Sequence, residues 1–224
     1  MSNKLQAFQK NAASLMRNKA ADKLLFYNDE SIKYGLVLTK EQAIRLIRHA
    51  IDNGVNYVDT AYNYHGGQSE IVVGEALKDG YRDKTYLATK CPVWLVKEPA
   101  DFDRLLDEQL TKLQTDHIDF YLLHAMSASR FDKYVQARAY EICLELKAEG
   151  KIRHLGMSFH DTAEVLDQML TAWPEIEFVQ LQFNYLDYED PRVQSRLCYE
   201  VCVKHGKPVM VMEPVRGGAL VNLP

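Results

Sequence analysis

From residue 39 onward the sequence repeats one pattern, in which an amphipathic helix is followed by a short run of apolar, β-branched or aromatic residues. Six such runs begin about 30 residues apart, and they cover residues 55–58, 85–89, 118–123, 154–158, 178–183 and 208–212. A strand, a crossover helix and the next parallel strand together need about 30 residues. Each interval therefore holds one crossover and little else, which predicts an α/β fold with a parallel sheet.

The predicted helices have recognisable ends. Thr39 and Gln42 form a capping box at the start of the first helix, and Gly54 ends it. Asp161 is the expected cap of the fifth helix. The other helices are expected at residues 69–78, from residue 101 onward, at 131–149 and at 191–205.

The regular alternation of helices and strands favours a TIM-type (β/α)8 barrel over a doubly wound sheet. The G-x-G-x-x-G turn that a dinucleotide-binding doubly wound fold would need is absent from the sequence. Only six strand–helix units are clear, whereas a closed barrel has eight. We therefore expect an incomplete barrel domain at residues 36–224, truncated at its C-terminus, with the first and last strands missing or atypical. An atypical segment at residues 1–35 precedes it.

Composition narrows the possible partners. The chain has 224 residues and a formal net charge of -4, and no basic stripe stands out, which argues against nucleic-acid binding. No apolar run is long enough to cross a bilayer, and the first ten residues carry no secretory signal, so we expect no membrane partner. The four cysteines form no C-x-x-C pair, which predicts no metal site and favours the cytoplasm. The oligomeric state is left open.

Three ionisable residues directly follow apolar strands that are neighbours in sequence, namely Asp59, Lys90 and His124. Reactive groups of a barrel lie at the carboxyl ends of its strands, so we expect these side chains to lie together. Tyr64 is in the loop after Asp59 and can reach the same region. Each residue alone could be structural, as an ion pair, a rim histidine or a packed tyrosine. Their placement at successive strand ends favours a reactive site.

These residue types suit acid catalysis by Tyr64. A free tyrosine has a pKa of about 10, and a nearby ammonium lowers that pKa because it favours the phenolate. Lys90 can supply this charge, Asp59 can hold Lys90 in place, and His124 can orient and polarise a carbonyl oxygen. The hydride that completes a reduction has to come from a cofactor, because no side chain supplies one.

Three motifs carry a resemblance to a known family: DTAYNY at residues 59–64, ATK at residues 88–90 and LLH at residues 122–124. They resemble the aspartate-to-tyrosine signature, the lysine strand end and the histidine strand end of the aldo-keto reductases. All four members of that family's catalytic tetrad are therefore matched. The resemblance covers roughly residues 36–220 and implies a barrel that reduces carbonyl compounds.

The same resemblance implies a cofactor site. Ser158 matches the serine that contacts the nicotinamide carboxamide, and Gln180 matches the glutamine that binds the same group. Phe159 stands where the family often has Asn, so that second contact is not assigned. The segment MEPVRGGAL at residues 212–220 resembles the stretch beside the nicotinamide and pyrophosphate, which adds Met212, Pro214, Arg216, Gly217 and Gly218 as cofactor-binding residues. The expected cofactor is NADP(H) or NAD(H), and a surface salt bridge is the alternative for Arg216.

His65 and Trp94 would line the substrate mouth, with packing as the alternative for both. Met212 and the segment SFHD at residues 158–161 resemble a subgroup with a C-terminal ferredoxin-like extension, whose Cys-rich motifs are absent here. We expect an oxidoreductase that transfers a hydride between a nicotinamide cofactor and an aldehyde or ketone, with Tyr64 as the proton donor. The alternatives are a cofactor-binding or regulatory module on the same scaffold, or an inactive truncated fragment.

Overall fold

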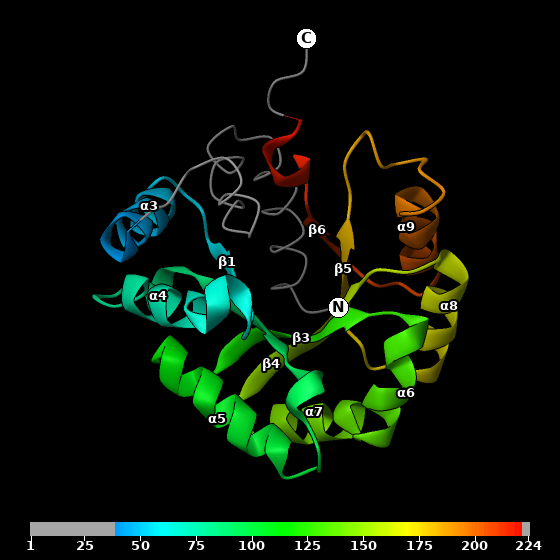
Figure 1. The fold of residues 1–224 in the computed structure, drawn as a ribbon, viewed down its shortest axis with the longest axis horizontal. Helices are drawn as coiled ribbons and strands as arrows, with labels where there is room; N and C mark the ends of the chain where they lie inside the picture. The colour runs from blue at the N-terminus through cyan, green and yellow to red at the C-terminus, as the bar shows by residue number, and fades with distance from the viewer. Residues whose placement is uncertain (1–38, 221–224) are drawn as a thin grey trace.

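The computed structural model describes residues 39–220, and one sheet of six parallel strands lies at its centre (Figure 1). The strands pair in sequence order, each with the next. They are β1 Tyr57–Asp59, β2 Tyr86–Cys91, β3 Ile118–Met126, β4 Ile152–Phe159, β5 Phe178–Gln182 and β6 Val209–Met212. The predicted parallel sheet and the incomplete (β/α)8 barrel are confirmed. The segment expected to be atypical, residues 1–35, lies outside the described residues.

Helices cover the outer side of the curved sheet (Figure 1). They are α3 Lys40–Asp52, α4 Ser69–Ala76, α5 Asp101–Leu113, α6 Ala128–Gln136, α7 Ala139–Ala148, α8 Ala163–Ala172 and α9 Ser195–Lys204. The predicted capping box of α3 is present, because the Gln42 amide donates to the Thr39 hydroxyl and the Thr39 amide donates to the Gln42 side chain. No helix within the described residues is long and apolar enough to cross a membrane.

Three of the predicted helices have wrong boundaries. The helix expected at residues 191–205 begins only at Ser195, after the left-handed Gln194. The single helix expected at residues 131–149 is two helices, α6 and α7, because Arg138 takes a left-handed φ of 52° between them. Asp161 is not the cap of α8, which begins after Thr162. The Asp161 carboxylate instead accepts hydrogen bonds from the backbone amides of Thr162 and Ala128, and so ties the start of α6 to the end of β4.

The two faces of the sheet carry separate apolar cores. The larger core lies between the strands and the helices and includes Leu87, Leu123 and Leu155. A smaller cluster lies on the inner face of the barrel wall. Its buried members are Ala88, Phe120, Leu122, Phe178 and Met210. Successive side chains of a strand point to opposite faces, so these two clusters establish which residues face inward.

The inward row continues at the carboxyl end of every strand with residues that can bind or react. By the same alternation it includes six predicted site residues, namely Asp59, Lys90, His124, Ser158, Gln180 and Met212. Gln182, the last inward residue of β5, was not predicted. The sheet therefore presents these residues along one edge, as expected for a barrel whose reactive groups gather at one end.

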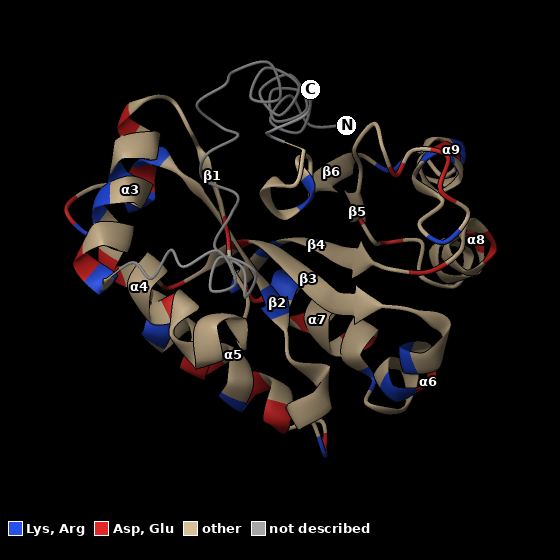
Figure 2. Ribbon diagram, turned by 45° about the horizontal axis from the view of Figure 1, so that its top comes forward, with Lys and Arg blue, Asp and Glu red and all other residues tan. Residues whose placement is uncertain are grey.

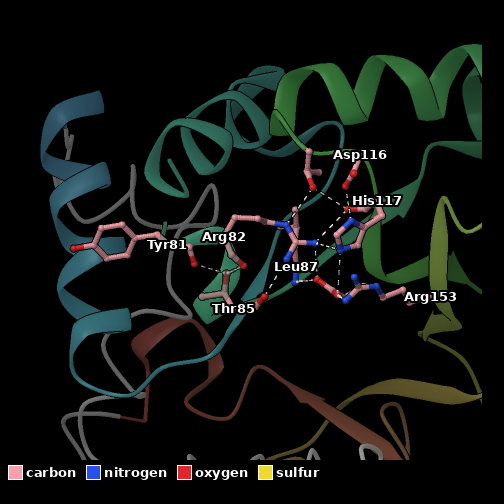
Figure 3. A network of polar contacts seen from close by, with 9 residues as sticks. Tyr81, Arg82, Thr85, Leu87, Asp116, His117 and Arg153 are labelled. Carbon is pink, nitrogen blue, oxygen red and sulfur yellow. Dashed lines mark hydrogen bonds and ion pairs between the residues drawn. The ribbon is translucent and has the colours of Figure 1, made fainter. Parts of the chain in front are cut away.

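The opposite end of the sheet is held by a charged network (Figure 3). The buried Asp119 of β3 lies 2.7 Å from the Arg82 guanidinium, receives a 2.8 Å hydrogen bond from Arg153, and accepts a 2.9 Å bond from the Leu87 amide. Arg82 Nη2 is also 2.9 Å from His117 Nε2. These contacts join the starts of β2, β3 and β4, whereas elsewhere the charged residues lie mostly on the outer helices (Figure 2).

Candidate active site

Lys90 and Asp59 form a buried ion pair at the carboxyl end of the sheet. Lys90 Nζ lies 2.8 and 2.9 Å from the two Asp59 carboxylate oxygens and donates a 2.9 Å bond to the Thr60 carbonyl. The Lys90 side chain is 2% exposed. Burial acts to lower the pKa of this ammonium, but Asp59 and Tyr64 outweigh it, so the pKa is raised above its ordinary value. Lys90 is therefore a fixed positive charge.

Tyr64 reaches this charge from a tight turn. The turn, η2 Tyr64–Gly67, holds three successive residues in left-handed conformation, with φ values of 53° at His65, 62° at Gly66 and 85° at Gly67. Two of the three are glycines, which adopt this conformation without steric cost. The turn places the Tyr64 ring with its centroid 4.8 Å from Lys90 Nζ. His65 is half-buried in the same turn.

His124 lies near Tyr64, and burial keeps its ring neutral. The two ring centroids are 6.0 Å apart. Burial, with smaller contributions from the charges of Lys90 and of two further groups, lowers the pKa of His124 to about 3. Its Nδ1 is buried and has no hydrogen-bond partner among residues 39–220. The exposed Trp94, from η4 Val93–Leu95, lies 5.4 Å from the His124 ring, so the structure brings it to the predicted mouth.

Ser158 and Gln180 extend the site along β4 and β5. They are register partners, and both are buried. Gln180 Nε2 lies 3.4 Å from Asp59 Oδ2, whereas Gln180 Oε1 is buried without a partner in the described part of the chain. The Ser158 oxygen accepts a 2.8 Å bond from the Ala125 amide, and its own proton remains available for donation. A free amide acceptor beside a hydroxyl donor fits a carboxamide such as that of nicotinamide.

The remaining predicted cofactor residues follow β6. Met212 and Pro214 are half-buried, and Arg216, Gly217 and Gly218 form the short helix η5 Arg216–Gly218. Arg216 Nε lies 3.7 Å from the buried carboxylate of Asp187. Arg216 therefore pairs with a buried carboxylate, whereas the alternative predicted for it was a salt bridge at the surface. These residues share the edge of the sheet with Gln180 because β6 pairs with β5.

The comparisons with known proteins decide the family. The model of the aldo/keto reductase family matches residues 31–223. The chain belongs to this family. Phe159, to which no cofactor contact was assigned, belongs to the outer core and is 3% exposed, away from the inward row.

Several aldo/keto reductases are similar to this chain over most of its length. The NADH-specific methylglyoxal reductase of Escherichia coli is 29% identical over 83% of the chain. An aldo-keto reductase of Klebsiella pneumoniae solved with NADPH is 32% identical, with a TM-score of 0.61 over 77% of the chain and 57% of its own. The holo form of a Bacillus halodurans member is 31% identical, with a TM-score of 0.67 over 85% of the chain and 62% of its own. The chain spans only 60% of the E. coli relative.

A buried polar network behind Lys90 was not predicted from the sequence. Gln109 donates a 2.6 Å bond to the Glu70 carboxylate and a 3.1 Å bond to the Lys90 carbonyl. Thr89 donates a 2.7 Å bond to the same carboxylate, and Tyr121 donates a 2.8 Å bond to Gln109. One signal was available, because Gln109 lies on the apolar face of α5 between leucines. A polar residue in such a stripe predicts a buried partner.

Proposed function

We propose that this chain carries the hydride-transfer site of an NAD(P)H-dependent reductase of aldehydes or ketones. The observation that carries the proposal is that Tyr64 lies close to both Lys90 and His124. Its ring centroid is 4.8 Å from Lys90 Nζ and 6.0 Å from the centroid of the His124 ring. A proton donor, a fixed positive charge and a neutral ring that can form a hydrogen bond therefore lie together. A carbonyl oxygen bound there would be polarised and protonated at the same place.

Tyr64 supplies the proton in this mechanism. Its hydroxyl donates to the carbonyl oxygen as negative charge develops there, and the adjacent Lys90 ammonium stabilises the phenolate that remains. Asp59 holds Lys90 in position through both carboxylate oxygens. When bound, a nicotinamide cofactor supplies the hydride.

His124 orients the carbonyl oxygen. With a pKa of about 3 the imidazole is uncharged near neutrality, so it acts as a directed hydrogen-bond donor and not as a proton source. The tautomer that donates toward the substrate leaves the other ring nitrogen as an acceptor. Trp94, whose ring lies 5.4 Å away, and His65 would flank the substrate.

Ser158 and Gln180 would hold the nicotinamide carboxamide, since one offers a donor and the other a free acceptor. Met212, Pro214, Arg216, Gly217 and Gly218 would line the rest of the cofactor at the end of β6. NADPH and NADH both remain in the proposal, because relatives of each kind are similar to this chain. The four buried free cysteines support a reducing compartment, the cytoplasm.

Substitution of the proposed acid tests this function. We would measure NADPH and NADH oxidation with methylglyoxal and with an aromatic aldehyde, for the wild type, Tyr64→Phe and the control Tyr62→Phe. The Tyr62 hydroxyl donates to Glu108 and has no part in the proposed mechanism. We expect Tyr64→Phe to lose about 10²-fold or more in turnover and Tyr62→Phe to retain it. Unchanged turnover in Tyr64→Phe would remove the proposed acid.

Cofactor titration followed by fluorescence separates the two alternatives. Tight cofactor binding without turnover of any carbonyl would favour a binding or regulatory module. No binding at millimolar cofactor would favour an inactive fragment. Binding together with turnover supports the reductase.

A further inference from the structure

The strand that carries His124 contains an extra residue at that position. Leu123 of β3 pairs with Met157 of β4, and the next pair is Met126 with Phe159. Two residues of β3, His124 and Ala125, therefore face the single residue Ser158 of β4. This two-against-one count defines a β-bulge, which bends the strand and re-aims its side chains.

The bulge changes which face the strand presents after His124. Phe120 and Leu122 belong to the inner cluster, so His124 continues the inward row. Strict alternation would also turn Met126 inward, but Met126 is buried in the outer core under the helices. Because of the extra residue, the His124 imidazole faces inward at the reactive edge and Met126, two residues later, faces the outer core.

The bulge contains an unfavourable backbone conformation. Ala125 has a φ of 53°, a left-handed conformation that is sterically unfavourable for an alanine. Such a conformation persists only when its surroundings determine it. The carbonyl of His124 and the amide and carbonyl of Ala125 need hydrogen-bond partners.

Three side chains supply these partners. The Tyr134 hydroxyl of α6 donates a 2.7 Å hydrogen bond to the His124 carbonyl. Ser158 accepts a 2.8 Å bond from the Ala125 amide, and Arg130 donates a 2.8 Å bond to the Ala125 carbonyl. Of the three, Tyr134 is the one that bonds to His124 itself, and it is 0% exposed. Burial raises the pKa of the Tyr134 phenol well above its usual value, so the hydroxyl remains a donor.

We propose that Tyr134 is a positioning residue for His124: its buried hydroxyl fixes the carbonyl of the bulged residue and thereby the direction of the imidazole. Ser158 anchors the other half of the bulge and also lies in the proposed carboxamide site, so the bulge connects the substrate-orienting ring to the cofactor site. The inference rests on the proposed function only for its kinetic consequence. The placement of the ring can be measured without substrate.

The test compares Tyr134→Phe with Tyr140→Phe. Both changes remove one hydroxyl from a buried tyrosine, and the Tyr140 hydroxyl bonds to Glu175, remote from the bulge. Because a small misplacement of an orienting group slows the chemical step, we expect Tyr134→Phe to lower kcat about tenfold and to change the KM of the carbonyl substrate less than twofold. Tyr140→Phe should keep both constants within about twofold.

The placement of the His124 ring is also measured directly by NMR. In the free chain, the Cε1–H resonance of His124 in a 13C–1H NMR spectrum should shift in Tyr134→Phe and stay in place in Tyr140→Phe. A folded Tyr134→Phe variant with an unmoved His124 resonance would overturn the proposal. If the resonance moves but neither the wild type nor any variant turns over a carbonyl, the positioning stands and the proposed function fails.

The Ala125→Gly variant provides a second background in case Tyr134→Phe alone does not fold. Ala125→Gly removes the cost of the left-handed conformation, because glycine adopts it freely. If Tyr134→Phe does not fold alone, the same comparison is made between Ala125→Gly and the double variant Ala125→Gly/Tyr134→Phe. The proposal predicts the same His124 shift and a lower kcat in the double variant, and equal spectra and equal kcat would contradict it.

Discussion

Lys90 and Asp59 hold each other through both carboxylate oxygens, at 2.8 and 2.9 Å, across neighbouring strands of the barrel wall. The pair is asymmetric in its access to water, since the lysine side chain is 2% exposed and the aspartate side chain is 18% exposed. The lysine therefore depends on the aspartate for most of its charge compensation.

Asp59→Asn should destabilise the fold as well as the site. The substitution leaves a buried ammonium without its counter-charge, and breaking a buried pair in this way costs about 3 kcal/mol or more. Urea unfolding measures the loss. Asp79→Asn is the control, because Asp79 pairs with Arg48 at 74% side-chain exposure, and exposed pairs contribute little. Equal unfolding midpoints for the two variants would contradict the prediction.

His124 should make the protein less stable in acid. Its folded pKa of about 3 lies below the ordinary value of 6.5, because burial and then Lys90, His160 and Arg130 disfavour the charged ring. Below pH 6.5, His124 binds a proton in the unfolded chain but not in the folded chain, so the free energy of unfolding falls as the pH drops from 6.5 toward 3. The slope from this group approaches about 1.4 kcal/mol per pH unit.

Thermal unfolding at pH 7, 5 and 4 tests this dependence. His124→Gln should flatten the acid decline relative to the wild type, whereas His49→Gln, at an exposed position of α3, should not. Parallel curves for the wild type and His124→Gln would show that His124 is charged or exposed in the folded chain. For the same reason, turnover should show no loss between pH 7 and 5 that depends on His124.

The sequence revealed the strands and most of the reactive edge for a local reason. Asp59, Lys90 and His124 are ionisable residues that each directly follow an apolar run, at or near the carboxyl end of a strand. Ser158 and Gln180 are not ionisable, so no change of residue type marks them within their strands. They were identified through family resemblance alone.

The two backbone irregularities could not be predicted, because they do not occur at the residue types that usually indicate a break or a bulge. The break between α6 and α7 occurs at Arg138, and the bulge of β3 at Ala125, and neither position is a glycine or a proline. The left-handed Ala125 is held by contacts from outside its own strand, because its amide bonds to Ser158 and its carbonyl to Arg130 of α6. A backbone conformation that depends on partners distant in sequence cannot be predicted from the local sequence pattern.

Gly156→Ala should strain the inner face of the barrel. A Cβ built on Gly156 would lie 2.4 Å from two atoms of the Phe178 ring, well inside van der Waals contact. Overpacking of this kind costs about 1–3 kcal/mol, measured by urea unfolding. The cause is specific, so Phe178→Leu in the same chain should recover part of the loss and give a favourable coupling in a double-mutant cycle. Additive losses would place the strain elsewhere.

Gln109→Leu should destabilise the chain even though it makes the buried face of α5 wholly apolar. Gln109 is 0% exposed and donates to the Glu70 carboxylate at 2.6 Å and to the Lys90 carbonyl at 3.1 Å. Leucine would leave a buried carboxylate with fewer donors, and the loss of a charge-assisted bond at a buried group costs about 3 kcal/mol. Gln168→Leu, at an exposed position of α8, is the matched control and should change the unfolding free energy by less than about 0.5 kcal/mol. A Gln109→Leu variant as stable as the wild type would mean that Glu70 is held by Thr89 and its other neighbours alone, and that the network behind Lys90 does not need the amide.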